Sequence, residues 1–216
     1  MRAVKHTDNG IEVVDVPRPD TDGGHVRVRV RSAGICGSDL HMLTWGPMPV
    51  TLGHEIAGHL DDGTPVAVWP LVPCGECDRC AAREVTQCRS AIPHSYGIGR
   101  DGGMADEIVV EESCVVPLPA GVDVVDASLV EPIACSLHAL RRAGVRGDQR
   151  VAVVGAGAIG LGAAAVARAM GCTVDVLARH DAQRQAAERI GAGTAPEGEY
   201  DVVVDAAGTD SALRVC

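Results

Sequence analysis

The chain has 216 residues, of which 46% are apolar and only 2% aromatic, with no phenylalanine. This length supports one large domain or two small ones, with a core built from Val, Ala, Leu and Ile. A net charge of −10 without a basic cluster argues against nucleic acid and anionic membranes as partners. We find no signal-peptide pattern and no apolar stretch long enough to span a bilayer, so we expect a cytoplasmic protein.

The first 120 residues carry the pattern of strands and turns. Residues 25–34 alternate sharply between apolar and polar side chains, as a half-buried strand does. Residues 64–73 predict another strand, and 105–119 predict two more, with Gly and Pro between the runs. The pattern indicates a small, mainly β barrel. A helical periodicity follows over 126–145, where Gly144 is a candidate C-terminal cap.

Strands and helices then alternate, which predicts a doubly wound parallel sheet. The expected strands cover 150–155, 173–178 and 200–208, and the expected helices cover 158–171 and 181–193, with Asp181 as N-cap. We therefore predict an α/β fold with a mainly β N-terminal part, divided into domains 1–147 and 148–216.

The second half of a dinucleotide-binding fold is largely missing from this pattern. A complete fold needs two βαβαβ halves. The connection from Gly191 to Asp201 is too short for a strand plus a helix, and 211–216 resembles the beginning of a helix. We expect a truncated chain; a compact variant that is complete as written is the alternative.

Four cysteines form the strongest metal signal, at the spacing C-x2-C-x2-C-x7-C: Cys74, Cys77, Cys80 and Cys88. Four thiolates on one loop can close a tetrahedron around zinc and leave no position for a substrate. Coincidence or a pair of disulfides is the alternative, which the odd total of nine cysteines disfavours. The site would be structural. We expect Cys114, Cys135 and Cys172 to be small buried hydrophobic residues.

A second possible metal set is mixed and lies on separate segments. Cys36 stands in GICGSDLH, and His54 and Glu55 stand in LGHE. Such a set leaves zinc able to take water or an alcohol, so it would be catalytic. Considered singly, a cysteine is usually a core residue and a histidine usually a surface one.

Gly155, Gly157 and Gly160 form G-x-G-x-x-G between a predicted strand and a predicted helix. The first glycine allows a tight turn, the second lets a pyrophosphate approach the backbone at a helix N-terminus, and the third allows close helix–strand packing. The motif predicts a nicotinamide dinucleotide as cofactor.

Together, GICGSDLH, TLGHEIAG, the four-cysteine loop, LVEPIACSLHAL and GAGAIGLGAAAVARAMG resemble the zinc-containing medium-chain alcohol dehydrogenases, in the family's order. The likeness is strongest to the branch of sorbitol and threonine dehydrogenases. It implies a GroES-like barrel followed by a partial Rossmann domain. It also implies catalytic and structural zinc, and hydride transfer between a secondary alcohol or polyol and NAD(P).

The resemblance also implies roles for individual residues. Cys36, His54 and Glu55 would hold the catalytic zinc, and Glu131 falls where the family places its remaining ligand, bound directly or through water. Asp39 would accept the N–H of His54 and fix its tautomer.

A proton relay is the second implied role. An alcohol held by zinc has a lowered pKa, and its proton must leave before hydride departs. Ser38 resembles the first member of this relay, and His41 resembles its solvent end. Trp45 would either line the substrate pocket or pack within its own loop.

The choice between NAD and NADP depends on the end of the second strand of the dinucleotide fold. An acid there would bind the adenosine ribose and select NAD. Asp175 lies within the strand, whereas its end reads Ala178, Arg179 and His180. Because Arg179 could bind a 2′-phosphate, the sequence favours NADP.

Two alternatives stay open at this point. The chain as written could be an inactive zinc-binding fragment, because the family places part of its nicotinamide pocket and its assembly strands beyond residue 216. A zinc-free quinone reductase relative is disfavoured by the full set of zinc ligands. The resemblance implies homo-oligomers for a complete protein and does not identify the alcohol.

Overall fold

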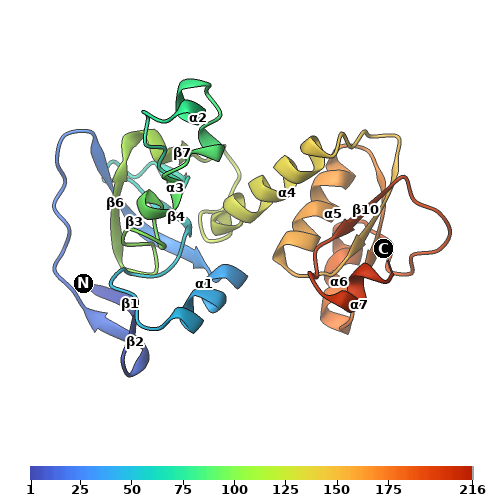
Figure 1. Ribbon diagram of the computed structural model, residues 1–216, viewed down its shortest axis with the longest axis horizontal. Coiled ribbons are helices and arrows are strands. Elements are labelled where there is room, and N and C mark those ends of the chain that lie inside the picture. The colour runs from blue at the N-terminus through green and yellow to red at the C-terminus, as the bar shows by residue number, and fades with distance from the viewer. Residues whose placement is uncertain (216) are drawn as a thin grey trace. The chain divides into compact units, whose positions relative to one another are not determined.

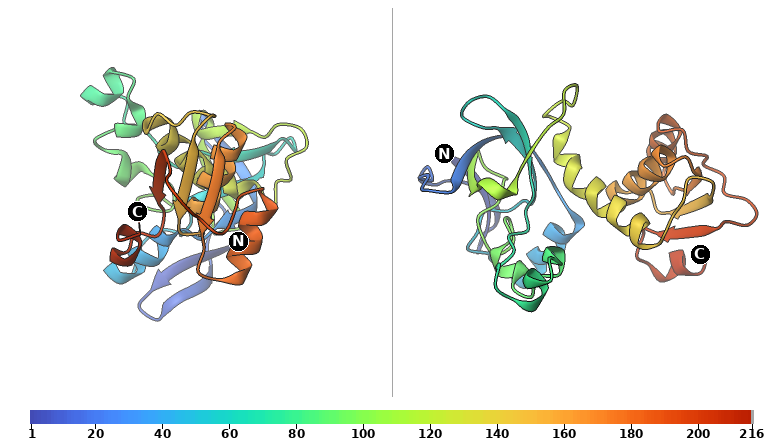
Figure 2. Two further views of the ribbon diagram at one scale, coloured as in Figure 1. Left: turned by 90° about the vertical axis from the view of Figure 1, so that its right-hand side faces the viewer. Right: turned by 90° about the horizontal axis from the view of Figure 1, so that it is seen from above.

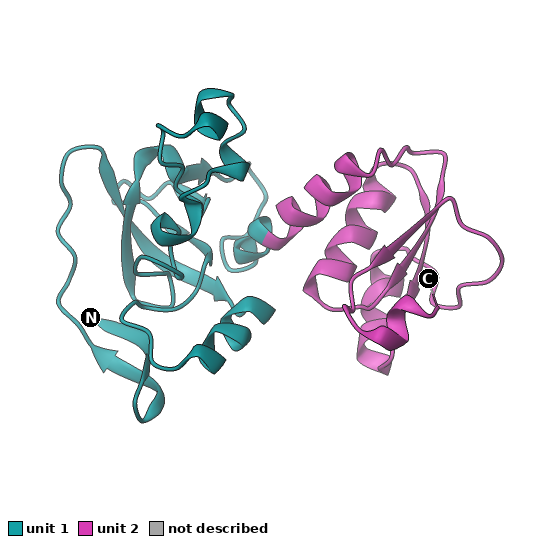
Figure 3. Ribbon diagram, in the orientation of Figure 1, with its two compact units in different colours: residues 1–131 teal, residues 132–216 magenta. Residues whose placement is uncertain are grey.

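The computed structural model describes residues 1–215, which divide into two compact units between Glu131 and Pro132 (Figures 1 and 3). The N-terminal unit begins with an antiparallel hairpin of β1 (Arg2–Thr7) and β2 (Gly10–Asp15). None of the helices in the described residues combines the length and apolar character that a membrane crossing requires.

A curved five-stranded antiparallel sheet forms the body of the N-terminal unit (Figure 2). Its order is β6 (Glu107–Glu111), β3 (His25–Gly34), β4 (Glu55–His59), β5 (Pro65–Val68) and β7 (Val115–Pro117). Every second residue points inward, so Val28, Ile56, Val66 and Val110 pack in one fully buried core. These strands confirm the β pattern predicted from the sequence.

Short helices interrupt the connections of this unit. They are α1 (Gly37–Met42), η1 (Leu43–Trp45), α2 (Asp78–Ala81), η2 (Val85–Gln87), α3 (Ala91–His94), η3 (Glu112–Cys114) and η4 (Ala127–Leu129). These helices were not predicted from the sequence, because helices this short carry too few residues to show a period of 3.6.

The C-terminal unit holds a parallel sheet in the order β10 (Val202–Asp205), β8 (Arg150–Val154), β9 (Thr173–Leu177). Its longer helices are α4 (Val130–Arg142, whose first two residues belong to the other unit), α5 (Ala158–Ala169) and α6 (Asp181–Arg189). The short α7 (Asp210–Leu213) ends the described chain. The predicted alternation of strand and helix is confirmed.

Small side chains let α5 approach its neighbours closely. Gly162, Ala163, Ala164 and Ala167 are buried along it. A Cβ on Gly162 would lie 2.9 Å from the hydroxyl of Ser136 on α4, so a larger residue there would require the helices to move apart.

Beside β9, where a further parallel strand would stand, the chain makes a single parallel bridge between Asp175 and Gly193. The segment up to Asp201 is held by Arg150, which donates to the carbonyls of Glu197 and Glu199 at 3.1 and 2.7 Å. The connection from Gly191 to Asp201 is therefore held by hydrogen bonds and does not form a strand and a helix. Its short length predicted this result.

Two local predictions were wrong. The N-cap of α6 is His180, whose backbone is extended, and Asp181 is the first helical residue, paired with Arg184. Of the scattered cysteines, Cys114 and Cys172 are buried as expected, but Cys135 is exposed on α4. The next residue, Ser136, takes the buried position, where it donates to the carbonyl of Pro132. Of the predicted helix beginning at 211–216, Cys216 lies outside the described residues.

Candidate metal centres and coenzyme cleft

The four loop cysteines converge on one point. Their sulfur atoms all lie within 4.8 Å of one another. Cys74 Sγ lies 3.9 Å from Cys80 Sγ, and the backbone N–H of Cys74 donates to Cys88 Sγ at 3.3 Å. The loop turns through α2 and η2, and Arg89 closes it with a two-point ion pair to Asp78 at 2.6 and 2.7 Å.

The four thiol groups of this loop lie so close together that their ionised forms would need a cation. Backbone N–H groups of Arg89 and Cys80 lower the pKa of Cys77 to about 6. Desolvation, with the neighbouring Cys77 and Cys88, raises the pKa of Cys80 to about 12. Four thiolates cannot share this space unless a positive ion compensates them, so the donor set and its spacing fit a closed zinc site.

The second set is assembled from two neighbouring strands. Cys36 follows β3, His54 directly precedes β4, and Glu55 is the first residue of β4. One ligand atom from each lies within 4.8 Å of the other two, and His54 and Glu55 are buried. Gly34 pairs with Glu55 across the sheet, and a Cβ there would lie 1.9 Å from Glu55 Oε2. The glycine thus leaves the space that the carboxylate occupies.

Asp39 orients the imidazole of His54. Its Oδ1 lies 3.2 Å from His54 Nδ1, at an angle poorer than that of a good hydrogen bond. Burial lowers the pKa of His54, but Asp39 and Cys36 outweigh it and raise that pKa to about 9. With Nδ1 turned to a carboxylate, Nε2 is left for the metal position, which is the orientation expected of a zinc ligand.

Glu131 does not belong to the group of three whose atoms approach within 4.8 Å. It lies at the start of α4, half-buried, and its charge acts on the site. Burial raises the pKa of Glu55, and the charge of Glu131 raises it further. Glu131 is thus a near neighbour of the centre, and its role as a direct ligand stays a prediction.

Helix α1 carries the two predicted relay residues on one face. Ser38 Oγ lies 3.4 Å from His54 Nε2, beside the position a metal would take. His41, three residues later, is exposed, and its ring centre lies 5.7 Å from that of Trp45 in an edge-on arrangement. The hydroxyl of Ser38 therefore lies beside the open metal set, whereas the imidazole of His41 lies at the surface.

The glycine-rich turn in the C-terminal unit separates β8 from α5. Gly155 has a φ of +101°, which favours glycine strongly. A Cβ on Gly160 would lie 1.9 Å from the carbonyl oxygen of Gly155, whereas one on Gly157 would meet nothing within 4 Å. The first and third glycines are required by the fold, and the second faces open space, as a pyrophosphate site requires.

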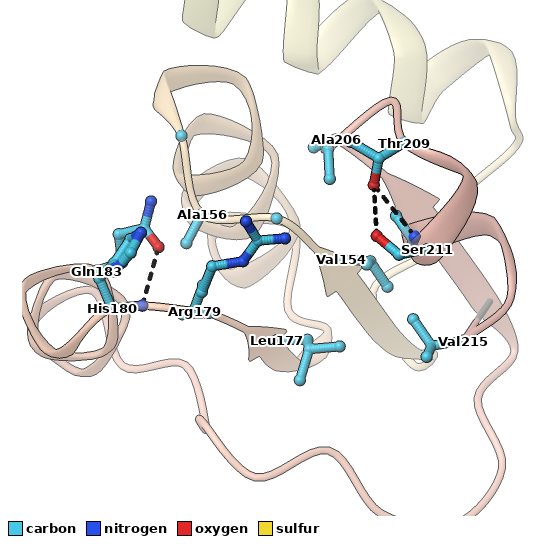
Figure 4. Close-up of a pocket in the computed structure, with 15 residues that line it drawn as sticks. Val154, Ala156, Leu177, Arg179, His180, Gln183, Ala206, Thr209, Ser211 and Val215 are labelled. Atoms are coloured by element: carbon cyan, nitrogen blue, oxygen red, sulfur yellow. Dashed lines mark hydrogen bonds between the residues drawn. The ribbon is translucent and has the colours of Figure 1, made fainter.

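A cavity of about 470 Å³ opens at this turn, along the carboxyl ends of the three parallel strands (Figure 4). Figure 4 shows the guanidinium of Arg179 pointing into it from the end of β9. No hydrogen bond or ion pair engages that guanidinium within residues 1–215. The open glycine turn can take a pyrophosphate, and the unpaired guanidinium of Arg179 can take a further phosphate group. A ligand that carries both therefore fits this cavity.

Asp175 is engaged elsewhere. Its carboxylate accepts the hydroxyl of Tyr200 at 3.0 Å, and a Cβ on Gly193 would meet its Oδ1 at 1.9 Å. Asp175 therefore contacts the short connection between α6 and β10 and does not line the cavity. Thr209, the N-cap of α7, and Ser211 within it also line the cavity, and their hydroxyl oxygens lie 3.0 Å apart. These two residues were not predicted from the sequence, in which their place after the strand-end motif DAAG is the only signal.

Comparison with known proteins covers both units. The alcohol dehydrogenase GroES-like domain matches residues 22–120, and the pyridine nucleotide-disulphide oxidoreductase family matches 150–192. L-Galactonate-5-dehydrogenase of Escherichia coli is 38% identical over 73% of this chain and 50% of its own length. Sorbitol dehydrogenase of Bacillus subtilis is 32% identical over 88% of this chain and 59% of its own. The chain thus spans about half the length of these curated relatives.

A solved structure extends the similarity. A zinc-binding dehydrogenase of Sinorhizobium meliloti bound to NADP is 31% identical, with a TM-score of 0.90, over 98% of this chain and 71% of its own. At 98% coverage, the match extends over both units of the chain. The chain therefore belongs to the zinc-containing medium-chain alcohol dehydrogenase family.

Proposed function

We propose that the chain carries the metal and coenzyme sites of a dehydrogenase that oxidises a secondary alcohol or polyol with NADP or NAD. The observation that carries this proposal is the convergence of Cys36, His54 and Glu55, with the imidazole turned by Asp39. These three residues would hold the catalytic zinc, with Glu131 close by. Cys74, Cys77, Cys80 and Cys88 would hold the structural one.

When bound, zinc supplies a Lewis acid that acidifies the alcohol, and the nicotinamide accepts hydride. The chain's own residues handle the proton. Ser38 would take it from the alcohol and pass its own hydroxyl proton on; the 3.4 Å between its Oγ and His54 Nε2 supports this role. His41 would release a proton to solvent, a role that its exposure on the same helix face supports. Asp39 keeps the imidazole of His54 in one tautomer throughout.

In the coenzyme site, Gly157 would admit the pyrophosphate to the N-terminus of α5, while Gly155 and Gly160 hold the turn. Arg179 would hold a 2′-phosphate, which favours NADP. Replacing Arg179 with Asp should shift the ratio of efficiencies toward NAD by about tenfold or more, since an acid binds the ribose hydroxyls and repels the phosphate. An unchanged ratio would remove Arg179 from coenzyme selection.

The proposed function also implies a location, a class of partner and an oligomeric state. We place the protein in the cytoplasm, with a small-molecule alcohol and no nucleic acid as partner, and expect homo-oligomers when the rest of the family's domain is present. The functional division would be a catalytic part at 1–147 and a coenzyme part at 148–216. The net charge of −10 supports the absence of nucleic acid among its partners.

A second candidate is a zinc-binding fragment without catalysis, favoured by the coverage of only 50% of L-galactonate-5-dehydrogenase. Metal content and alcohol-dependent reduction of NADP or NAD, measured on this 216-residue chain, separate the two. Two zincs with turnover support the dehydrogenase. Two zincs without turnover support the fragment, and no zinc refutes both.

A further inference from the structure

A short connection joins the end of β9 to the beginning of α6, and the arginine that faces the cavity is its middle residue. Because β9 ends at Leu177 and α6 begins at Asp181, the connection consists of Ala178, Arg179 and His180. All of these residues line the cavity at the glycine-rich turn (Figure 4). The guanidinium of Arg179 has no hydrogen bond or ion pair within residues 1–215, so its direction depends first on the backbone that carries it.

Arg184, in the first half of α6, holds that backbone on both sides of Arg179. Its Nη1 donates to the carbonyl oxygen of Ala178 at 3.1 Å and to that of Arg179 at 3.2 Å. The first carbonyl belongs to the peptide plane before Arg179, and the second belongs to the plane after it. Because peptide units are planar, holding both planes fixes φ and ψ of Arg179, and with them the direction of its Cα–Cβ bond.

The guanidinium of Arg184 is itself held in place. Its Nη2 pairs with the carboxylate of Asp181, three residues earlier on the same helix. Since an arginine presents its donors in one rigid plane, this ion pair orients Nη1 toward the two carbonyls. Arg184 is half-buried and does not line the cavity, so any effect it has on a ligand there would pass through Arg179.

We infer that Arg184 is a positioning residue for the coenzyme: it holds the backbone of Arg179 so that the guanidinium of Arg179 meets the 2′-phosphate of NADP. This inference rests on the proposed function, which gives that phosphate to Arg179. A group that is oriented before its ligand arrives loses less conformational freedom on binding. Arg184 should therefore strengthen binding of the 2′-phosphate and leave recognition of the remaining nucleotide unchanged.

Two nucleotide fragments test this inference without requiring turnover. Adenosine 2′,5′-bisphosphate and adenosine 5′-monophosphate differ only in the 2′-phosphate. Each fragment is titrated into the ¹⁵N-labelled chain of 216 residues, and the shifts of its backbone amide resonances give the two dissociation constants. The discrimination ratio is the dissociation constant of the monophosphate divided by that of the bisphosphate, so it isolates the contribution of the 2′-phosphate.

The wild type, Arg184→Ala, Arg179→Ala and the double variant form a double-mutant cycle. The wild-type ratio should be about tenfold or more, as expected for a charge-assisted contact to phosphate. Arg184→Ala should lower the ratio about three- to tenfold, because the backbone of Arg179 is released. In the Arg179→Ala background the same substitution should change it by less than about twofold, since no guanidinium is left to position.

A matched control comes from the same helix. Arg189→Ala removes an exposed arginine from the last turn of α6 and should keep the wild-type ratio. An equal loss from Arg184→Ala in both backgrounds would show that Arg184 acts through its own charge, and would overturn the inference. So would a wild-type ratio in Arg184→Ala, or an equal weakening of both fragments, which would indicate a purely structural role.

The wild-type titrations separate the inference from the proposed function. Where the wild type prefers the bisphosphate and Arg179→Ala loses that preference, the coenzyme site stands whatever Arg184→Ala does. A wild-type ratio near one would overturn the inference together with the role of Arg179 in coenzyme selection. A wild-type chain that binds neither fragment would refute the coenzyme site of the proposed function itself.

Discussion

The two metal sets of the N-terminal unit differ in how the chain brings them together. The cysteine loop gathers its four sulfur atoms within fifteen residues, on a segment closed by the Asp78–Arg89 ion pair. The open set joins Cys36 to His54 and Glu55 across two strands and needs the space left by Gly34. The cysteine loop is formed by residues close in sequence, whereas the open set depends on strand pairing. Substitutions should therefore affect zinc binding at the two sites separately.

The largest effect should follow loss of one thiolate from the loop. Cys77→Ser should release the structural zinc, whose binding is worth roughly 10 kcal/mol or more in small zinc domains. Residues 74–95 have little apolar content and should become sensitive to protease. Metal content should fall from two zincs to one, and Cys135→Ser, outside the loop, should keep both. Loss of both metals would show that the two sites are not independent.

Ser38→Ala should act on the open set without removing its metal. Because the hydroxyl lies 3.4 Å from His54 Nε2 and takes the proton in the proposed mechanism, turnover should fall about 10²–10⁴-fold. Zinc content should stay at the wild-type value, and Ser38→Thr should restore much of the rate. Unchanged turnover in the alanine variant would remove Ser38 from the mechanism.

Asp39→Asn should weaken zinc binding at the open set and leave the cysteine loop unchanged. Without the carboxylate 3.2 Å from Nδ1, His54 loses its orientation and part of its basicity, and zinc affinity at this site should fall about 10–100-fold. Competition with a chromophoric chelator measures this, with Asp20→Asn as a surface control. Release of zinc from the cysteine loop at the same chelator concentration would contradict the division between the sites.

The pH dependence of metal binding should also distinguish them. In the metal-free chain, Asp39 and Cys36 hold the pKa of His54 at about 9 against the opposing effect of burial. Zinc must displace that proton below pH 9, so affinity at the open set should rise by up to about tenfold per pH unit toward pH 9. Isothermal titration in buffers of different ionisation enthalpy would count the protons released. A proton count that stays constant from pH 6 to 9 would be inconsistent with this coupling.

Much of the fold follows from the sequence because the signals are local. The alternation in His25–Gly34 identified a half-buried strand, and the glycines at 155, 157 and 160 identified a turn between β8 and α5. The spacing of the cysteines identified a closed metal loop. Each depends on residues that are neighbours along the chain, where backbone geometry limits the possible arrangements.

Tertiary structure decided what spans longer distances. Only the pairing of β3 with β4 brings Cys36 to His54 and turns the imidazole toward Asp39. The same holds for the partner of Asp175: the sequence placed this acid within the strand rather than at its end, but only the structure shows that its carboxylate accepts the hydroxyl of Tyr200. Side-chain direction depends on contacts between distant segments, and no periodicity in the sequence encodes those contacts.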